Sequence, residues 1–165
     1  MIFSKSRKEA LELLKGGVWH TTSKKRFDGI IADGFIRVSP NIPNASRWKT
    51  SGGPDCYPFV RKLGGISLFD FRDFDEVEYS SRCPMSSWHE FVPVCSGWES
   101  SIWIEINIKK LGTSFVDGAI LLQRWKDEAA YRHAIMPYIE ACSLADIPTS
   151  TFIRNIALER TSEFK

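Results

Sequence analysis

Hydrophobic and polar side chains alternate most regularly between residues 101 and 108. Isoleucine takes every second position of this segment, at Ile102, Ile104, Ile106 and Ile108. The positions between them hold Ser101, Trp103, Glu105 and Asn107. A repeat of two residues is typical of a strand with one buried face. We therefore expect a strand over 101–108 whose isoleucines face the core.

Cap residues indicate two helices near the N-terminus. Ser6 and Glu9 have the spacing of a capping box, and the glycine pair at 16–17 ends the helix that follows. Ser23 can cap a second helix, which Gly34 ends. The apolar positions of this second helix are Phe27, Ile30 and Ile31.

Two more helices are expected further along the chain. Residues 73–76 predict the start of a short helix that runs to about Tyr79. A longer helix is indicated over 115–129, where apolar residues recur at helical spacing. These residues are Phe115, Ala119, Leu122, Trp125 and Ala129.

Short strands account for most of the remaining regular structure. Apolar and β-branched segments predict strands at 18–22, 36–38, 65–69, 138–142 and 152–158. Residues 39–65 contain four prolines and four glycines without a period, which predicts a long loop. Residues 80–100 are irregular as well. Short strands with few helices, not in regular alternation, predict an α+β fold.

Composition is that of an ordinary globular protein. The chain has 165 residues, of which 43% are hydrophobic and 25% are charged. These values favour one domain, 1–165, and exclude a disordered tail, a collagen and a coiled coil. The formal charge of +2 gives no support for a general affinity for nucleic acid, although a local basic patch would escape this count. Aromatic residues make up 13%, enough for some rings to stack on a flat ligand.

The sequence shows no motif for a membrane span, a metal site or a redox centre. No apolar run approaches the length of a membrane span, and the N-terminal residues lack an apolar signal core, so we expect a cytoplasmic protein. No cysteine pair has the spacing of a redox or zinc motif, and we expect free thiols and no metal site. The four cysteines are Cys56, Cys83, Cys95 and Cys142. Glycine motifs of the P-loop and the Rossmann fold are absent too.

Three segments, in order, resemble the ADP-ribosyltransferase fold. Trp19-His20-Thr21-Thr22-Ser23, followed by a helix and Asp33-Gly34-Phe35, is similar to the aromatic-His-x-Thr strand that opens the fold. Residues 65–69 resemble its middle strand, which precedes a short helix that ends in tyrosine, here Tyr79. Residues 137–141, followed by Ile147 and Pro148, resemble the closing strand with its catalytic glutamate. The resemblance spans most of the chain and implies a split β-sandwich of short strands with a few flanking helices.

The resemblance also implies an activity. Such enzymes cleave the nicotinamide–ribose bond of NAD and transfer ADP-ribose to an acceptor, so NAD would be the co-substrate. The catalytic pair would be Glu140, which stabilises the positive charge that develops on the ribose, and His20, which holds a ribose hydroxyl. The cofactor-binding residues would be His20, Thr21, Thr22, Ser67, Phe71 and Tyr79, with Phe71 or Tyr79 stacked on the nicotinamide.

Several alternatives stay open at this stage. Arg37, Arg47 and Arg61 all suit a diphosphate. Tyr138 stands where arginine-modifying members of the family carry Glu or Gln, so the acceptor is unknown. NAD hydrolysis, removal of a 2′-phosphate from RNA, and a non-catalytic aromatic-rich binding module are the competing functions. Glu105, which faces away from the isoleucines of its strand, is the next carboxylate to test after Glu140.

Overall fold

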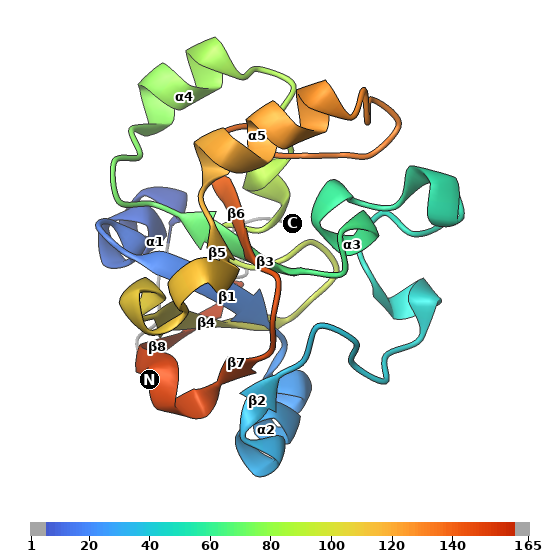
Figure 1. The fold of residues 1–165 in the computed structure, drawn as a ribbon. Helices are drawn as coiled ribbons and strands as arrows, with labels where there is room; N and C mark the ends of the chain where they lie inside the picture. The colour runs from blue at the N-terminus through green and yellow to red at the C-terminus, as the bar shows by residue number, and fades with distance from the viewer. Residues whose placement is uncertain (1–5, 161–165) are drawn as a thin grey trace.

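The computed structural model describes residues 6–160, and its centre is an antiparallel six-stranded sheet in the order β5-β6-β3-β1-β4-β8 (Figure 1). A second, two-stranded sheet pairs β2 with β7. The strands are β1 (Val18–Thr22), β2 (Phe35–Ile36), β3 (Ile66–Asp70), β4 (Ser100–Ile106), β5 (Phe115–Val116), β6 (Glu140–Ser143), β7 (Ile147–Pro148) and β8 (Phe152–Glu159). The fold is α+β, as the sequence predicts.

Within residues 6–160, five α-helices and six short 3₁₀ turns surround the sheets. The α-helices are α1 (Arg7–Leu14), α2 (Lys24–Asp33), α3 (Phe59–Lys62), α4 (Glu76–Arg82) and α5 (Gly118–Asp127). The 3₁₀ turns are η1 (Asn44–Ser46), η2 (Pro54–Cys56), η3 (Trp88–Glu90), η4 (Ile108–Lys110), η5 (Gly112–Ser114) and η6 (Thr149–Thr151). In Figure 1, α4 and α5 lie at one end of the molecule, and α2 with β2 lies at the other.

The caps of the first two helices are confirmed. Ser6 Oγ accepts a hydrogen bond from the Glu9 amide, and Ser23 Oγ accepts one from the Arg26 amide. Gly34 ends α2 with φ of 83°, a left-handed conformation that glycine adopts without steric cost. The loop predicted over 39–65 contains η1, η2 and the short helix α3, which the sequence pattern did not indicate.

The prediction that β4 has one buried face is wrong. Trp103 and Ser101, on the face opposite the isoleucines, are both fully buried. The strand lies between β1 and β8, and each of its faces packs on a separate hydrophobic cluster. Trp103 belongs to the cluster of Trp19, whereas Ile104 belongs to the other. The strand also ends before Ile108, which begins a 3₁₀ turn.

Helix α5 and strand β6 begin later than predicted. Phe115 belongs to β5, and the helix starts after Asp117, whose carboxylate accepts a hydrogen bond from the Ile120 amide. Strand β6 starts at Glu140 because Tyr138 has φ of 63° and therefore forms part of a turn.

The central sheet opens between β1 and β3. These strands pair only at Val18↔Asp70 and Trp19↔Phe69, whereas β1 continues to pair with β4 as far as Thr22. Strand β3 likewise continues to pair with β6 back to Ile66. The two strands thus diverge beyond Trp19 and leave a wedge between their free ends.

None of the helices within 6–160 has the length and hydropathy of a membrane span. Residues 1–5, from which the lack of a signal core is partly argued, lie outside the described residues.

Candidate functional site

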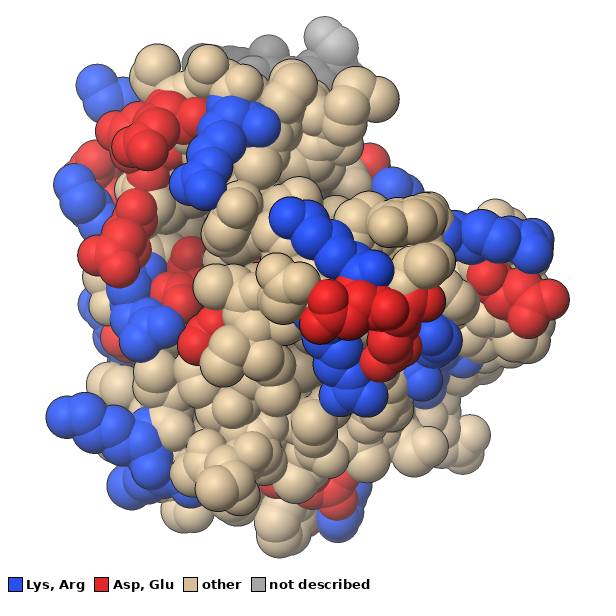
Figure 2. All heavy atoms as spheres, turned by 45° about the horizontal axis from the view of Figure 1, so that its top comes forward, with Lys and Arg blue, Asp and Glu red and all other residues tan. Residues whose placement is uncertain are grey.

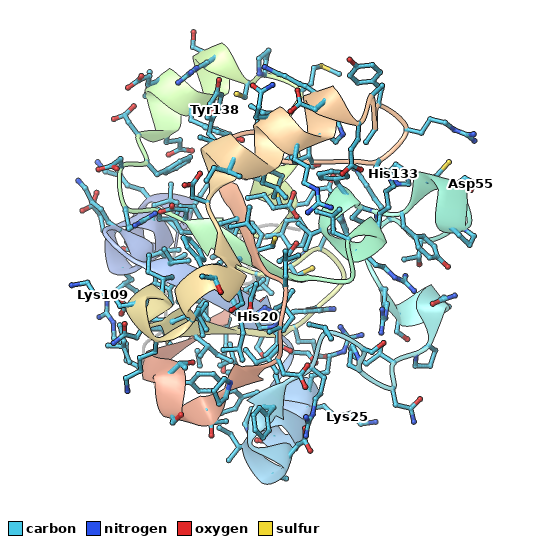
Figure 3. The ribbon with its side chains drawn as sticks, in the orientation of Figure 1. His20, Lys25, Asp55, Lys109, His133 and Tyr138 are labelled. Atoms are coloured by element: carbon cyan, nitrogen blue, oxygen red, sulfur yellow. The ribbon has the colours of Figure 1, made fainter. Side chains whose placement is uncertain are left out.

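A cavity of about 600 Å³ occupies the wedge between β1 and β3. Its walls come from the ends of these strands, from α2, from the 39–65 loop and from the segment before β6. Such a volume is typical of pockets that bind a small organic ligand. Figure 3 shows His20 near the middle of the molecule, within this region.

Glu140 lies at the inner end of the cavity and is almost fully buried, at 1% exposure. Its Oε1 accepts a hydrogen bond of 2.5 Å from Ser67 Oγ, and its Oε2 accepts one of 3.0 Å from the Met136 amide. No described lysine or arginine forms an ion pair with it. The carboxylate is therefore fixed in position but not neutralised by a cation.

Burial sets the electrostatics of this carboxylate. Loss of water around the group raises the pKa of Glu140 above 4.5, and the hydrogen bonds from Ser67 and Met136 oppose that rise. A negative charge held here interacts strongly with a positive charge nearby, because little solvent screens it.

His20 lies across the wedge and is held by the same residue of β3. Its Nδ1 is 3.1 Å from the Ser67 carbonyl oxygen. A carbonyl can only accept, so Nδ1 carries the proton and donates it. Burial lowers the pKa of His20 below 6.5, which keeps the imidazole neutral and leaves Nε2 with a free lone pair.

Thr21, Thr22 and Ser67, expected to bind a cofactor, also line the cavity. Thr21 Oγ1 is buried and has no hydrogen-bond partner in the structure. A buried hydroxyl without a partner costs free energy, and a ligand that supplies the partner recovers it. Five of the seven residues expected at the site thus converge on one cavity: His20, Thr21, Thr22, Ser67 and Glu140.

The remaining two, Phe71 and Tyr79, are not brought to the cavity. Phe71 is 1% exposed and packs among core aromatics, with its ring centroid 5.3 Å from that of Phe74. Tyr79 lies behind the segment before β6, where its hydroxyl donates to the Pro137 carbonyl at 2.7 Å. Neither ring can stack on a ligand in this cavity, and the expected stacking role is wrong for both.

Other aromatic side chains line the cavity instead. Trp48, Phe69 and Phe91 do so, and Trp48 packs edge-on against Phe91 with centroids 5.0 Å apart. The Trp48 indole donates to Glu90 at 2.8 Å, which ties the 39–65 loop to η3. Trp48 was not assigned to the site from the sequence. Its position next to Arg47, in a long loop that carries several basic residues, could have indicated a contact with a ligand.

The arginines of the cavity fall into two kinds. Arg37 is bound by the carboxylates of Asp33 at 2.6 Å and Asp146 at 2.9 Å, so its charge is compensated. Arg47 and Arg61 line the cavity without an ion pair to any described acidic residue. Arg26 of α2, which sequence reasoning did not consider, joins them.

Residues 6–160 contain neither a disulfide nor a cluster of possible metal ligands. The four cysteines are free thiols, and Cys95 and Cys142 are buried. The described residues contain no group of three or more His, Cys, Asp or Glu side chains placed to hold a metal ion.

No family model and no curated protein matches the chain. Among solved structures, protein CC0527 from Caulobacter crescentus, a structural-genomics target, shares 11% identity over 88% of each chain, with a TM-score of 0.48. A similarity at this level carries no argument about fold or activity.

Proposed function

We propose that the protein is an ADP-ribosyltransferase-like enzyme that cleaves the nicotinamide–ribose bond of NAD and transfers ADP-ribose to an acceptor. The observation that carries the proposal is the convergence of Glu140 and His20 on Ser67 at the wedge between β1 and β3. A buried carboxylate without a cation, beside a neutral histidine and open to a cavity, is the kind of arrangement that clusters at functional sites. In that reading, the opened sheet is the split β-sandwich of the fold.

The cavity suits a nicotinamide nucleotide in size and in its mixture of groups. Apolar and aromatic walls from Trp48, Phe69 and Phe91 fit a flat ring. Polar groups lie at the strand ends, where β1 leaves β3 and Thr21 Oγ1 is unpaired. The backbone of this strand end is free to hold the nicotinamide amide.

Glu140 acts on the transition state. As the glycosidic bond breaks, its electrons move to the nicotinamide nitrogen and positive charge develops at the ribose carbon. The Glu140 carboxylate, fixed by Ser67 and Met136, stabilises that charge without having to reorganise. The acceptor then bonds to the ribose carbon and releases its proton.

His20 orients the ribose in this proposal. Because Nδ1 donates to the Ser67 carbonyl, Nε2 is an acceptor and can accept a hydrogen bond from a ribose hydroxyl. Ser67 therefore positions both functional side chains, one through its carbonyl and one through its hydroxyl.

The test is nicotinamide release from NAD by wild type and by Glu140→Gln. Glutamine keeps the size of the side chain but carries no charge. Its oxygen can accept from the Met136 amide, and its NH₂ group can donate to the Ser67 hydroxyl, which then acts as acceptor. We expect a loss on the order of 100- to 1000-fold in rate with little change in NAD affinity. Labelled NAD would show whether ADP-ribose reaches a co-purified acceptor or water.

Glu105→Gln is the matched control. Glu105 lies on β4, outside the cavity lining, and binds Arg154 at 2.6 Å. Its replacement should leave turnover unchanged. Equal turnover by wild type and Glu140→Gln would remove Glu140 from the reaction, and no release by wild type would sink the proposed activity.

A further inference from the structure

Three arginines meet at the side of the cavity formed by α2 and the 39–65 loop. Arg26 Nη2 donates to the Ser46 carbonyl at 2.6 Å, and Arg47 Nη2 donates to the Pro40 carbonyl at 2.8 Å. Arg61 Nη2 donates to Asn44 Oδ1 at 2.7 Å. Each guanidinium is thus anchored on residues 40–46 by one terminal nitrogen, and its other donors have no hydrogen-bond partner among the described residues.

No described carboxylate forms an ion pair with these three side chains, although Arg61 lies over the Tyr57 ring and Arg26 over the Trp98 ring. Apart from Arg37, already bound by two carboxylates, they are the only cationic residues of the cavity lining, whose acids are Asp33 and Glu140. Asp33 is engaged by Arg37, and Glu140 by Ser67 and Met136. The cavity therefore has a net excess of positive charge at this side.

Two further observations indicate that the cluster is strained without an anion. The Nη1 of Arg61 is buried without any hydrogen-bond partner. Burial lowers the pKa of Arg47, and repulsion from Arg61 and Arg26 lowers it further. The three guanidinium groups repel one another, and one of their donors is buried without a partner. This arrangement destabilises the folded protein unless a ligand supplies negative charge.

We propose that Arg26, Arg47 and Arg61 form a phosphate cradle for a ligand that carries a phosphate monoester in addition to a diphosphate. The count of charges rests on the proposed function: the diphosphate of NAD has one negative charge on each phosphate, which leaves one guanidinium unmatched. A phosphate monoester adds close to two charges at neutral pH and three acceptor oxygens. The planar guanidinium of arginine can donate two parallel hydrogen bonds to one phosphate. Such paired bonds between charged groups are among the strongest hydrogen bonds in proteins.

The additional phosphate has two possible sources, and binding separates them. If it belongs to the donor, NADP should bind at least tenfold more tightly than NAD, as expected for one charged hydrogen bond. If it belongs to the acceptor, a short oligonucleotide with a terminal phosphate should bind better than its dephosphorylated form in the presence of NAD. Calorimetric titration measures both pairs.

Variants connect the preference to the cradle. Arg47→Gln and Arg61→Gln should each abolish the preference for the phosphorylated ligand and the rise in melting temperature that inorganic pyrophosphate gives wild type. Arg72→Gln is the control, since Arg72 lies outside the cavity lining and binds Asp70 at 2.6 Å. It should keep both properties. Without any anion, Arg47→Gln should melt above wild type because it relieves the repulsion.

Three results would overturn the proposal. If pyrophosphate leaves the melting temperature of wild type unchanged, the three arginines do not bind this anion and the proposed cradle does not exist. Equal binding of both members of both ligand pairs would show that no phosphate beyond the diphosphate is recognised. If the preference for the phosphorylated ligand persists in Arg47→Gln and Arg61→Gln, the phosphate binds at a site other than these arginines. These measurements need no turnover, so a lack of nicotinamide release would count against the proposed activity alone.

Discussion

At the scale of single residues, Glu140 is a carboxylate that is both buried and part of the cavity lining. Its carboxylate accepts hydrogen bonds from Ser67 and Met136, yet no described cation faces it. Such a group costs stability whenever it is ionised, because the low-dielectric surroundings disfavour its charge. Groups that cost stability in this way are typical of ligand sites.

We therefore expect Glu140→Gln to become more stable relative to wild type as pH rises. The pKa of Glu140 is raised above 4.5, so the folded state holds a proton that the unfolded chain has lost. Wild type thus loses stability as pH rises from 4.5 to the folded pKa, by up to about 1.4 kcal/mol per pH unit. Urea unfolding between pH 4 and 8 measures the free energy of unfolding of both proteins.

Glu128→Gln provides a control of opposite sign. Hydrogen bonds from Arg124 and Lys62 lower the pKa of Glu128, so its contribution to stability is present above 4.5 and is lost as pH falls. A stability difference for Glu140 that follows the same direction as Glu128 would show that the buried carboxylate is stabilised by its surroundings.

Residues expected to lie together because of their positions on predicted strands do line one cavity. His20, Thr21 and Ser67 lie on predicted strands, and their convergence follows from the order of the strands. Phe71 and Tyr79 failed because an aromatic residue reads the same in a sequence whether it faces a ligand or the core. Only the packing of Phe71 on Phe74 and the hydrogen bond of Tyr79 to Pro137 decide the matter.

At the scale of elements, the turn before β6 positions Glu140. The Glu140 amide donates to the Met136 carbonyl at 3.0 Å, while the Met136 amide donates to the carboxylate of Glu140. Tyr138, whose backbone is left-handed, lies between Met136 and Glu140 in the sequence. Figure 3 shows Tyr138 at the end of the molecule that carries α4 and α5. Tyr79 of α4 fixes the same turn from outside through Pro137.

Gly118→Ala should damage this turn. A Cβ on Gly118, at the first position of α5, would lie 2.1 Å from the Tyr138 carbonyl oxygen, so the backbone of one element must move. We expect a loss of about 1 to 3 kcal/mol in the free energy of unfolding. Under the proposed function, nicotinamide release should fall about 100-fold, because Glu140 shifts with the turn. Chemical denaturation and the release assay measure the two effects.

Gly29→Ala is the matched glycine replacement. Gly29 is exposed within α2, and a Cβ there would meet no atom within 4 Å. Alanine should stabilise the helix by about 0.5 to 1 kcal/mol. Similar stability changes for both glycines would contradict the close contact between α5 and Tyr138.

Elements with local signals were predicted well, and elements set by tertiary contacts were not. The caps at Ser6 and Ser23 fix the starts of α1 and α2 from nearby residues alone. The second buried face of β4 depends on what packs against Trp103, which alternation cannot reveal. The start of α5 at Gly118, in place of Phe115, follows from the pairing of β5 with β6.

At the scale of the whole molecule, charge is mixed over the surface and concentrated only locally. Figure 2 shows lysine and arginine side chains interspersed with aspartate and glutamate on the face that bears α4 and α5. The formal charge of +2 reflects this balance and conceals the arginines of the cavity. The α+β class was predictable from the pattern of segments, whereas the cavity arose from how two strands diverge.

That divergence implies that the sheet is two cooperative units. Strands β5, β6 and β3 form one half, and β1, β4 and β8 form the other, joined at Val18 and Trp19 and by the bonds of 16–17 with Phe71. Amide hydrogens of the two halves should exchange with deuterium at two distinct opening free energies in the free protein. A ligand that contacts both strand ends would join the halves, so that protection rises together across β4 and β6. A single common opening free energy before any ligand is added would contradict this division.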